Sequence, residues 1–211
     1  MKSLKTWAAA AAMLALTGAA QAALVNRGGG MIYDTTLNIT WLADWNYAKT
    51  SGFDADGRMN WTTANNWANN LVFGGFDDWR LPTSLNANGT GPCGPAYNCS
   101  GSEMGHMFYN NWGAAADSAF SLGTNAANLA LFSNVQSDIY WSGTGYAPNP
   151  DFAWFFSTEV GSQVSVGKGN ELYAVAVRPG DVAAPVPEPQ TLALALLALG
   201  ATVVARRRRP A

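Results

Sequence analysis

Charge and histidine are scarce in this chain. Of its 211 residues only 12% are charged, and one, His106, is a histidine. A single histidine excludes sites that need two, such as the His-Glu-x-x-His motif of zinc proteases. Between residues 23 and 189, six basic residues stand against 14 acidic ones, a net charge of −8. A segment this acidic repels polyanions, so we expect neither nucleic acid nor an anionic lipid surface as its partner.

Aromatic residues, in contrast, are plentiful. Eight of the nine tryptophans lie between residues 23 and 189. Disordered chains are poor in aromatic residues, so this segment is expected to fold around an aromatic core.

The first 22 residues have the three parts of a secretory signal peptide. Lys2 and Lys5 form a basic start, residues 7–16 are apolar, and residues 20–22 have the small side chains that signal peptidase requires. We therefore expect cleavage before Ala23 and an exported mature chain. A buried helix of the mature domain is the alternative.

The tail, residues 186–211, has an equally ordered pattern. A Pro-Glu-Pro motif, formed by Pro187, Glu188 and Pro189, precedes an apolar run over residues 192–205. As a helix the 14 residues of that run extend about 21 Å, less than the roughly 30 Å hydrocarbon core of a bilayer. Four arginines follow, which we expect to stay in the cytoplasm and stop transfer: Arg206, Arg207, Arg208 and Arg209.

In these three parts the tail resembles the PEP-CTERM sorting signal of Gram-negative bacteria that produce exopolysaccharide. The resemblance implies that an exosortase is a partner, which recognises the Pro-Glu-Pro motif and processes the chain, and that the tail contacts the membrane before processing. A plain membrane anchor is the alternative, but it does not need the motif. Residues 181–185 are expected to be a stiff spacer between this tail and a domain over residues 23–180.

The domain alternates short strands, helices and turns rich in Gly and Asn, which predicts an α+β fold. Apolar residues recur at helical spacing from Trp61 to Phe73, and the glycine pair at 74–75 is expected to end that helix. A second helix is expected from Ser102, which can cap it, to Asn110. Short apolar runs predict strands over residues 31–34, 39–42, 139–142, 153–157, 163–166 and 173–178.

Four motifs carry a further resemblance. They are residues 33–42, the element Asp77-Asp78-Trp79-Arg80-Leu81-Pro82-Thr83, residues 140–144, and the closing residues 174–178. In this order they resemble the Lcl C-terminal domain family, across about residues 31–180. The resemblance implies a compact fold of the C-type-lectin-like and formylglycine-generating-enzyme-like kind, with two helices and a loop-rich half. Some members of the family are adhesins whose domain binds sulfated polysaccharides.

Six residues are candidates for binding a ligand, above all a glycan. Sugar faces stack on aromatic rings while sugar hydroxyls bond to amide and carboxylate groups. Asp78 and Arg80 are a candidate polar pair beside Trp79. The favoured reading is nevertheless structural, with Trp79 in the core and Arg80 held by acids. The remaining candidates are Trp45, Trp112 and Trp154, whose orientation the sequence leaves open, as it does that of Tyr47 and Tyr146.

No cofactor is expected, and calcium is the one metal considered. Asp54 and Asp56 alternate before Gly57, as acidic residues do in some calcium loops. An EF-hand loop closes with Glu at its twelfth position, where Asn65 stands here. A solvated acidic turn is therefore favoured over a calcium site.

Glu103 and His106 lie three residues apart on the second expected helix, so they share one face. A hydrogen bond on the helix face is favoured over acid–base catalysis, because no serine or cysteine nucleophile in a recognisable motif accompanies them.

Cys93 and Cys99 enclose a turn-rich loop. In the oxidising compartments outside the cytoplasm they are expected to form a local disulfide. A redox or copper pair, like that of formylglycine-generating enzymes, is the alternative.

Taken together, these features predict a non-catalytic binding or matrix protein, located in the cell envelope or extracellular matrix of a Gram-negative bacterium. Its ligand is expected to be a polysaccharide or another matrix component. A structural surface protein without a ligand is one alternative, and an enzyme acting on surface polysaccharide is another. For the enzyme, Asp77 and Asp78 are poorly spaced, because adjacent residues of a strand point to opposite faces.

Overall fold

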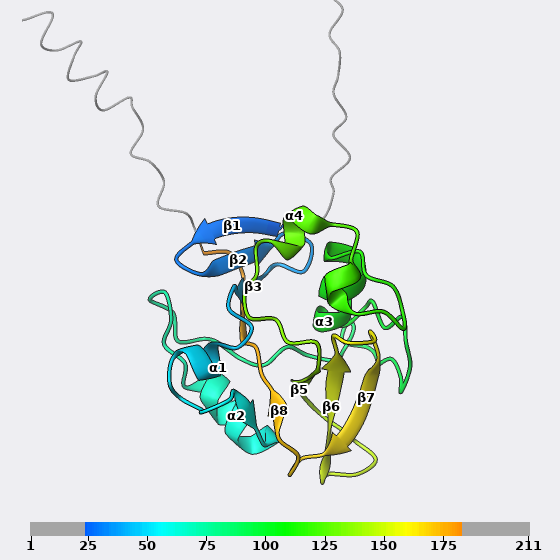
Figure 1. The fold of residues 1–211 in the computed structure, drawn as a ribbon. Coiled ribbons are helices and arrows are strands. Elements are labelled where there is room, and N and C mark those ends of the chain that lie inside the picture. The colour runs from blue at the N-terminus through cyan, green and yellow to red at the C-terminus, as the bar shows by residue number, and fades with distance from the viewer. Residues whose placement is uncertain (1–23, 183–211) are drawn as a thin grey trace, which may run out of the picture.

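The computed structural model describes residues 24–182, and its first sheet brings the two ends of that range together (Figure 1). Neighbouring strands of this sheet run antiparallel. In spatial order they are β1 (Leu24–Gly28), β2 (Met31–Asp34), β3 (Ile39–Leu42) and β9 (Val177–Pro179). The expected signal peptide, the spacer from residue 183 onward and the sorting tail lie outside the described residues.

The turn between β2 and β3 forms where the sequence predicts it. The Asp34 carboxylate accepts hydrogen bonds from the backbone N–H groups of Thr36 and Leu37, at 2.9 and 3.1 Å. Asn38 adopts a positive φ of 52°, which Asn tolerates better than most residues. The predicted limits of both strands, 31–34 and 39–42, are therefore confirmed.

A second sheet packs below the first, and it mixes strand directions. Its strands in spatial order are β4 (Arg58–Met59), β8 (Leu172–Tyr173), β5 (Ile139–Gly145), β6 (Phe152–Ser157) and β7 (Gln163–Gly167). Only β5 and β8 pair in parallel. The single strand expected over residues 173–178 is wrong, because the buried residues 174–176 cross from β8 in this sheet to β9 in the other.

Both predicted helices are present, but each departs from its expected form. The longer one, α2 (Trp61–Asn69), is capped by Asn60, which accepts a hydrogen bond from the Thr63 N–H at 3.0 Å. It ends four residues before Phe73, because Asn70 leaves helical geometry and its side chain donates to the Asn66 carbonyl.

The other predicted helix begins after its expected cap, Ser102, as α3 (Glu103–Gly105). It continues as a π-helix over His106–Asn111. The other helices are single turns: α1 (Tyr47–Thr50), a 3₁₀ turn at Phe120–Leu122, and α4 (Ala126–Leu129).

The core has two parts, and strand β3 separates them. Successive side chains of a strand point to opposite faces, so Trp41 enters one part and Leu42 the other. The first part gathers Trp45 and Trp112 around Trp41. The second holds Trp67, Trp79 and Trp141 under α2. The aromatic core expected from the tryptophan content is therefore present, and the described chain is an α+β fold.

Asp181 and Val182, expected as the start of the spacer, lie against the domain. Arg27 on β1 donates two hydrogen bonds to the Asp181 carboxylate, at 2.8 and 2.5 Å, and Val182 is buried. None of the helices within residues 24–182 has both the length and the hydropathy of a membrane crossing.

Candidate functional site

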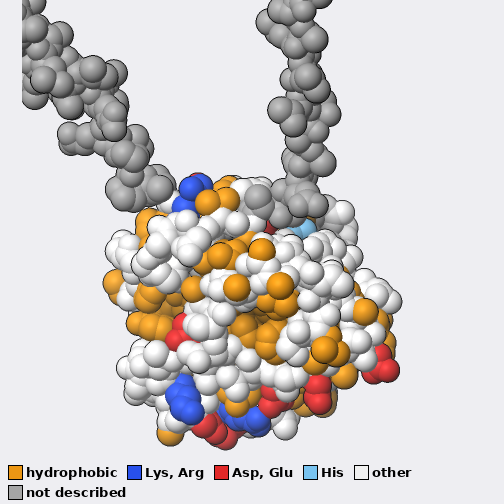
Figure 2. Space-filling model, turned by 45° about the horizontal axis from the view of Figure 1, so that its top comes forward, with side chains coloured by type: hydrophobic (Ala, Val, Ile, Leu, Met, Phe, Trp, Pro, Cys, Tyr) orange, Lys and Arg blue, Asp and Glu red, His pale blue; other side chains and the backbone are white. Residues whose placement is uncertain are grey.

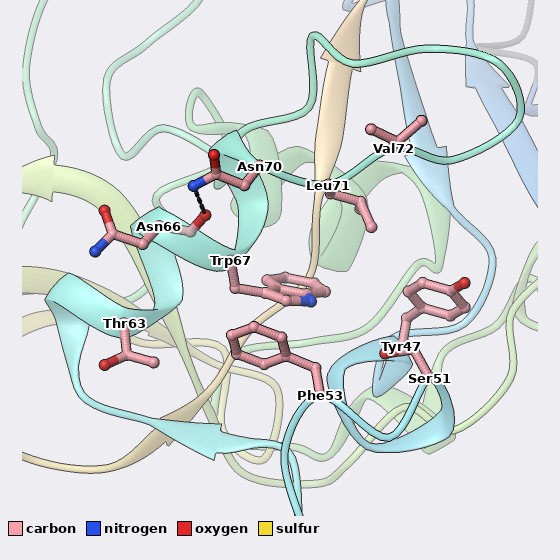
Figure 3. A pocket seen from close by; sticks show the side chains of 9 residues that line it. All are labelled: Tyr47, Ser51, Phe53, Thr63, Asn66, Trp67, Asn70, Leu71 and Val72. Atoms are coloured by element: carbon pink, nitrogen blue, oxygen red, sulfur yellow. Dashed lines mark hydrogen bonds between the residues drawn. The ribbon is translucent and has the colours of Figure 1, made fainter.

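A hollow of about 460 Å³ opens between α1, the loop that follows it, and α2 (Figure 3). Sites for small molecules typically measure about 300–1,000 Å³. Its side chains fall into an apolar set and a polar set. The apolar set consists of Tyr47, Phe53, Trp67, Leu71 and Val72. The polar set consists of Ser51, Thr63, Asn66 and Asn70. These nine residues are called the aromatic pocket below, and only Tyr47 among them bears an ionisable group.

Residue spacing along α2 builds one wall of the aromatic pocket. Thr63 and Trp67 are four residues apart, which places them on one side of α2, and Leu71 lies two residues beyond the end of the helix. The Trp67 ring is only 4% exposed, yet its edge reaches into the hollow (Figure 3). Figure 3 also shows its indole nitrogen directed toward Tyr47, and no residue within 24–182 accepts a hydrogen bond from it. An N–H donor without a protein partner at the edge of a hollow is free to bond to a ligand oxygen.

The loop after α1 presents Phe53, whose side chain is 55% exposed. Asp54 braces this loop by accepting hydrogen bonds from the N–H groups of Asp56 and Gly57, at 3.0 and 2.8 Å. A Cβ on Gly57 would meet the Asn46 side chain at 1.8 Å, so glycine is required there. Phe53 therefore stands on a fixed loop.

The same hydrogen bonds explain the alternating acids as a turn. Burial raises the pKa of Asp54 and the N–H groups of Asp56 and Gly57 lower it, with a net shift downward. Within residues 24–182 no group of three or more His, Cys, Asp or Glu side chains is placed to hold a metal ion. The carboxylates of Asp54 and Asp56 instead accept hydrogen bonds from the backbone of their own loop.

A row of aromatic rings supports the opposite wall of the pocket. Tyr47 meets Phe73 edge to face with ring centroids 5.0 Å apart, and Phe73 meets Trp79 at 5.9 Å. The Trp79 indole also donates a hydrogen bond to the Phe73 carbonyl at 3.2 Å. Trp79 itself is buried, so its candidacy as a sugar-stacking ring is wrong. Its structural reading holds, because it lies behind the wall that carries Tyr47.

Asp78 is engaged elsewhere and does not line the pocket. It accepts two hydrogen bonds from Arg178, at 2.7 and 3.0 Å, and these hold the pKa of Asp78 below its ordinary value. The Arg178 guanidinium also lies 3.9 Å from the centroid of Phe76. Phe76 pairs with Phe73 across the glycine pair 74–75, so this ion pair steadies the turn behind Val72.

Arg80 shows the structural arrangement that the sequence favours. It forms two hydrogen bonds to the buried Glu103 carboxylate, at 2.8 and 2.6 Å, and the Thr83 N–H donates to the same group at 2.8 Å. Burial lowers the pKa of Arg80 and Glu103 raises it, with a net shift upward. The outer side of Arg80 borders two smaller hollows of about 380 and 290 Å³. Its guanidinium is already paired there.

The other candidate tryptophans are buried. Trp45, Trp112 and Trp154 have almost no exposed surface, and Trp45 packs between Trp41 and Trp112 with ring centroids 5.4 and 4.8 Å away. Trp45 and Trp112 are covered by the first part of the core, and Trp154 is covered outside both parts of the core, with Tyr146 packed against it. None of the three presents a ring face to a ligand, so these candidates for glycan contact are wrong. Of the two tyrosines left open by the sequence, Tyr47 lines the pocket, whereas Tyr146 packs edge to face on Trp154.

No sequence pattern marked Phe53 or Val72 as a site residue. Val72 is 73% exposed and lies three residues after α2 ends, and Phe53 is the one aromatic residue of a polar run over residues 49–58. Large exposed apolar side chains that adjoin one another often mark a binding surface. An isolated phenylalanine in a polar loop is the one signal that could have been followed.

Glu103 and His106 do not form a pair. Glu103 is held by Arg80, whereas His106 contacts Asn110 at 2.8 Å and lies 3.8 Å from the Asp34 carboxylate. Burial lowers the pKa of His106, and the negative charge of Asp34 opposes that shift. The favoured reading, a hydrogen bond along the helix face, matches the contact with Asn110.

The predicted disulfide between Cys93 and Cys99 is confirmed. Its loop is tied to β7, because the Gln163 side chain donates to the Cys93 carbonyl at 2.6 Å. Ala96 and Gln163 also form an isolated backbone bridge. The disulfide therefore closes a loop that is fixed to the second sheet, on different elements from those that form the aromatic pocket.

Fold and site together define a small, disulfide-bonded α+β domain with a preformed and uncharged hollow. The chain belongs to the Lcl C-terminal domain family, whose model matches residues 30–178. Residues 185–209 match the PEP-CTERM protein-sorting motif, which marks the chain as an exosortase-targeted, exported protein of a Gram-negative cell envelope. A search of curated proteins finds no match.

Proposed function

We propose that this protein is a non-catalytic glycan- or matrix-binding component of the cell surface, and that the aromatic pocket is its binding site. The pocket carries the proposal, because it combines aromatic and aliphatic side chains with amides and hydroxyls. Apolar sugar faces stack on such rings, and sugar hydroxyls bond to such amides. The sorting motif adds support, since an exported envelope protein meets surface polysaccharide.

The absence of catalysis is part of this proposal. The residues that line the aromatic pocket include no Asp, Glu, His or Cys. The carboxylates of Asp78 and Glu103 already accept hydrogen bonds from arginine side chains. The one histidine is buried beside Asp34. A glycosidase needs two carboxyl groups facing one bond, and the pocket offers neither.

Chain organisation and fold ancestry complete the proposal. We place signal-peptide cleavage before Ala23, a short spacer after residue 182, exosortase processing at Pro187–Pro189, and retention with exopolysaccharide. A relationship to C-type-lectin-like and formylglycine-generating-enzyme folds is supported by chain ends that meet in one sheet and by a loop-rich stretch over residues 84–138. Superposing an experimental structure on those folds tests the relationship.

A glycan array tests the binding function directly. The full-length protein is purified in a detergent without a sugar headgroup and applied to a broad panel of bacterial surface glycans. We expect saturable binding to at least one class, weakened by Phe53→Ala. The matched control Phe152→Ala removes an exposed phenylalanine from β6, outside the pocket, and should bind as the parent does. Silence across the panel contradicts the proposal and favours a structural role without a ligand.

A further inference from the structure

We infer that the aromatic pocket selects neutral sugar units and rejects sulfated or carboxylated ones, an inference that rests on the glycan-binding function proposed above. Its lining holds no Lys, Arg or His. Recognition of a sulfate or carboxylate calls for a cation or a cluster of N–H donors, arginine being the usual choice. The pocket supplies instead two amides, three hydroxyls and one indole N–H.

The cations elsewhere on the domain are already engaged. Each of the four arginines within residues 24–182 forms an ion pair with a carboxylate: Arg27 with Asp181, Arg58 with Asp138, Arg80 with Glu103, and Arg178 with Asp78. The Lys168 ammonium lies over the Trp61 ring, 4.2 Å from its centroid. Lys49 on α1 is the remaining cation of the described residues and has no partner among them. A polyanion would have to compete with an internal carboxylate at every arginine.

The field of the whole domain also opposes an anionic ligand. Residues 24–182 contain six Lys and Arg against 13 Asp and Glu. On the face shown in Figure 2, apolar and uncharged polar side chains predominate, and most charged ones gather along its lower edge. At the pocket itself, Asp54 directly follows Phe53 and adds a negative charge, because an ordinary aspartate is already ionised at neutral pH and the pKa of Asp54 is shifted further down. An acidic surface lowers the local concentration of anions.

The pocket's own groups suit uncharged hydroxyls. Phe53 presents an open ring, and the Trp67 indole N–H points into the hollow without a partner. The Asn66 amide likewise has no partner within residues 24–182. An amide both donates and accepts hydrogen bonds, as a sugar hydroxyl does. A sulfate only accepts hydrogen bonds, so the amide oxygen cannot bond to it. Burying an anion in this apolar hollow would strip its water without a compensating charge.

An array that pairs neutral hexose oligosaccharides with the sulfated counterpart of each tests the inference on the full-length protein. We expect binding on the neutral side only, unchanged between about 50 mM and about 500 mM salt, because no ion pair is screened. Phe53→Ala should weaken that binding at least about tenfold, and Asn66→Ala severalfold. Phe152→Ala is the matched control for the first variant and Asn69→Ala, on the same helix but outside the pocket, for the second.

The outcomes distinguish a failure of the neutral selectivity from a failure of the glycan-binding function. Binding to sulfated members alone, falling with salt and lost in Lys49→Ala, overturns the neutral selectivity and leaves glycan binding intact. Equal binding to both members of each pair overturns the selectivity as well. Binding to neither member overturns the proposed function itself. Neutral binding that Phe53→Ala leaves unchanged removes the aromatic pocket from both arguments. Thermal unfolding of each variant, expected to match the parent, shows that loss of binding is not loss of fold.

Discussion

Two groups of aromatic side chains in the domain differ in what covers them. The closed cluster consists of Trp41, Trp45 and Trp112, whose indole N–H groups are buried without a partner within residues 24–182. In the aromatic pocket, the unpaired indole N–H of Trp67 faces an open hollow. Both groups lie among Asn and Gly in the sequence. The amino-acid composition predicts that aromatic rings cluster. Which cluster is open to a ligand depends on the segments that cover it in the tertiary structure.

The covering of the closed cluster comes from far along the chain. Phe132 lies 6.0 Å from the Trp45 ring centroid and Tyr140 lies 5.3 Å from it, both edge to face. No segment within residues 24–182 closes the aromatic pocket in this way, and the exposed Phe53 and Val72 form its rim. A loss of stability should therefore follow changes in the closed cluster, and a loss of binding should follow changes in the pocket.

The largest expected effect breaks the closed cluster. Trp45→Ala should lower the free energy of unfolding by about 3–5 kcal/mol, because it leaves a cavity among packed rings. Phe53→Ala should change it by less than about 1 kcal/mol, since its side chain is largely exposed. Urea titration followed by tryptophan fluorescence measures both. Equal losses of unfolding free energy in Trp45→Ala and Phe53→Ala would contradict the distinction between the closed cluster and the aromatic pocket.

A smaller effect tests the row of rings behind the pocket. Trp79→Leu should destabilise the fold by about 2–3 kcal/mol and also weaken ligand binding severalfold, because Phe73 and then Tyr47 lose their support. Trp154→Leu is the matched control, a buried tryptophan outside that row. It should destabilise the fold and leave affinity unchanged at temperatures where both variants are folded. Calorimetric titration and thermal unfolding on the same samples provide the comparison, and unchanged affinity in Trp79→Leu would contradict the supporting role.

The disulfide should matter to stability alone. Replacing Cys93 and Cys99 together by serine opens a small loop, for which loop-closure entropy predicts a loss of about 2 kcal/mol. The loop is fixed to β7 and shares no residue with the aromatic pocket, so affinity should stay within about twofold of the parent. A large fall in affinity at a temperature where the double variant is folded would show that the two regions are coupled.

The smallest expected effect is a difference in pH dependence. The pKa of His106 is lowered in the fold, so the unfolded chain binds more protons as the pH falls below about 6.5. Stability should therefore decline from about pH 7 to about pH 5, and His106→Gln should flatten that decline. Ligand affinity should stay constant over the same interval, because no Asp, Glu or His lines the pocket. If affinity fell together with stability as the pH is lowered, in both the parent and His106→Gln, the prediction would be wrong.

Features set by neighbouring residues were predictable from the sequence. The turn at residues 35–38, the helix start at Ser102 and the Cys93–Cys99 bond all depend on groups a few positions apart. The start of α2 at Trp61 follows from the spacing of its apolar residues. The crossing of residues 174–176 between sheets was not predictable, because an apolar run has the same pattern whether it pairs in one sheet or passes between two.

The site was harder to predict than the fold for a related reason. Whether Trp45 or Tyr47 meets solvent depends on Phe132, Tyr140 and Phe73, which reach them only through tertiary structure. The motif residues Asp78, Trp79 and Arg80 stood out in the sequence, and they serve the pocket and core from behind. The residues with exposed side chains around the hollow belong to no such motif.

Strand β9 has a mechanical consequence. It is bonded along one edge to β3, and on its other side Val177 and Arg80 exchange two backbone hydrogen bonds of 2.8 Å. Just beyond β9, the Arg27 side chain donates a hydrogen bond to the Asp181 carboxylate. Tension applied through the chain after residue 182 therefore enters a strand clamped on both edges. If a ligand held between α1 and α2 at the far end of the domain supplies the opposing pull, those bonds must be sheared together, not peeled apart singly (Figure 1). The arrangement favours resistance to force applied at the C-terminal end of the described residues.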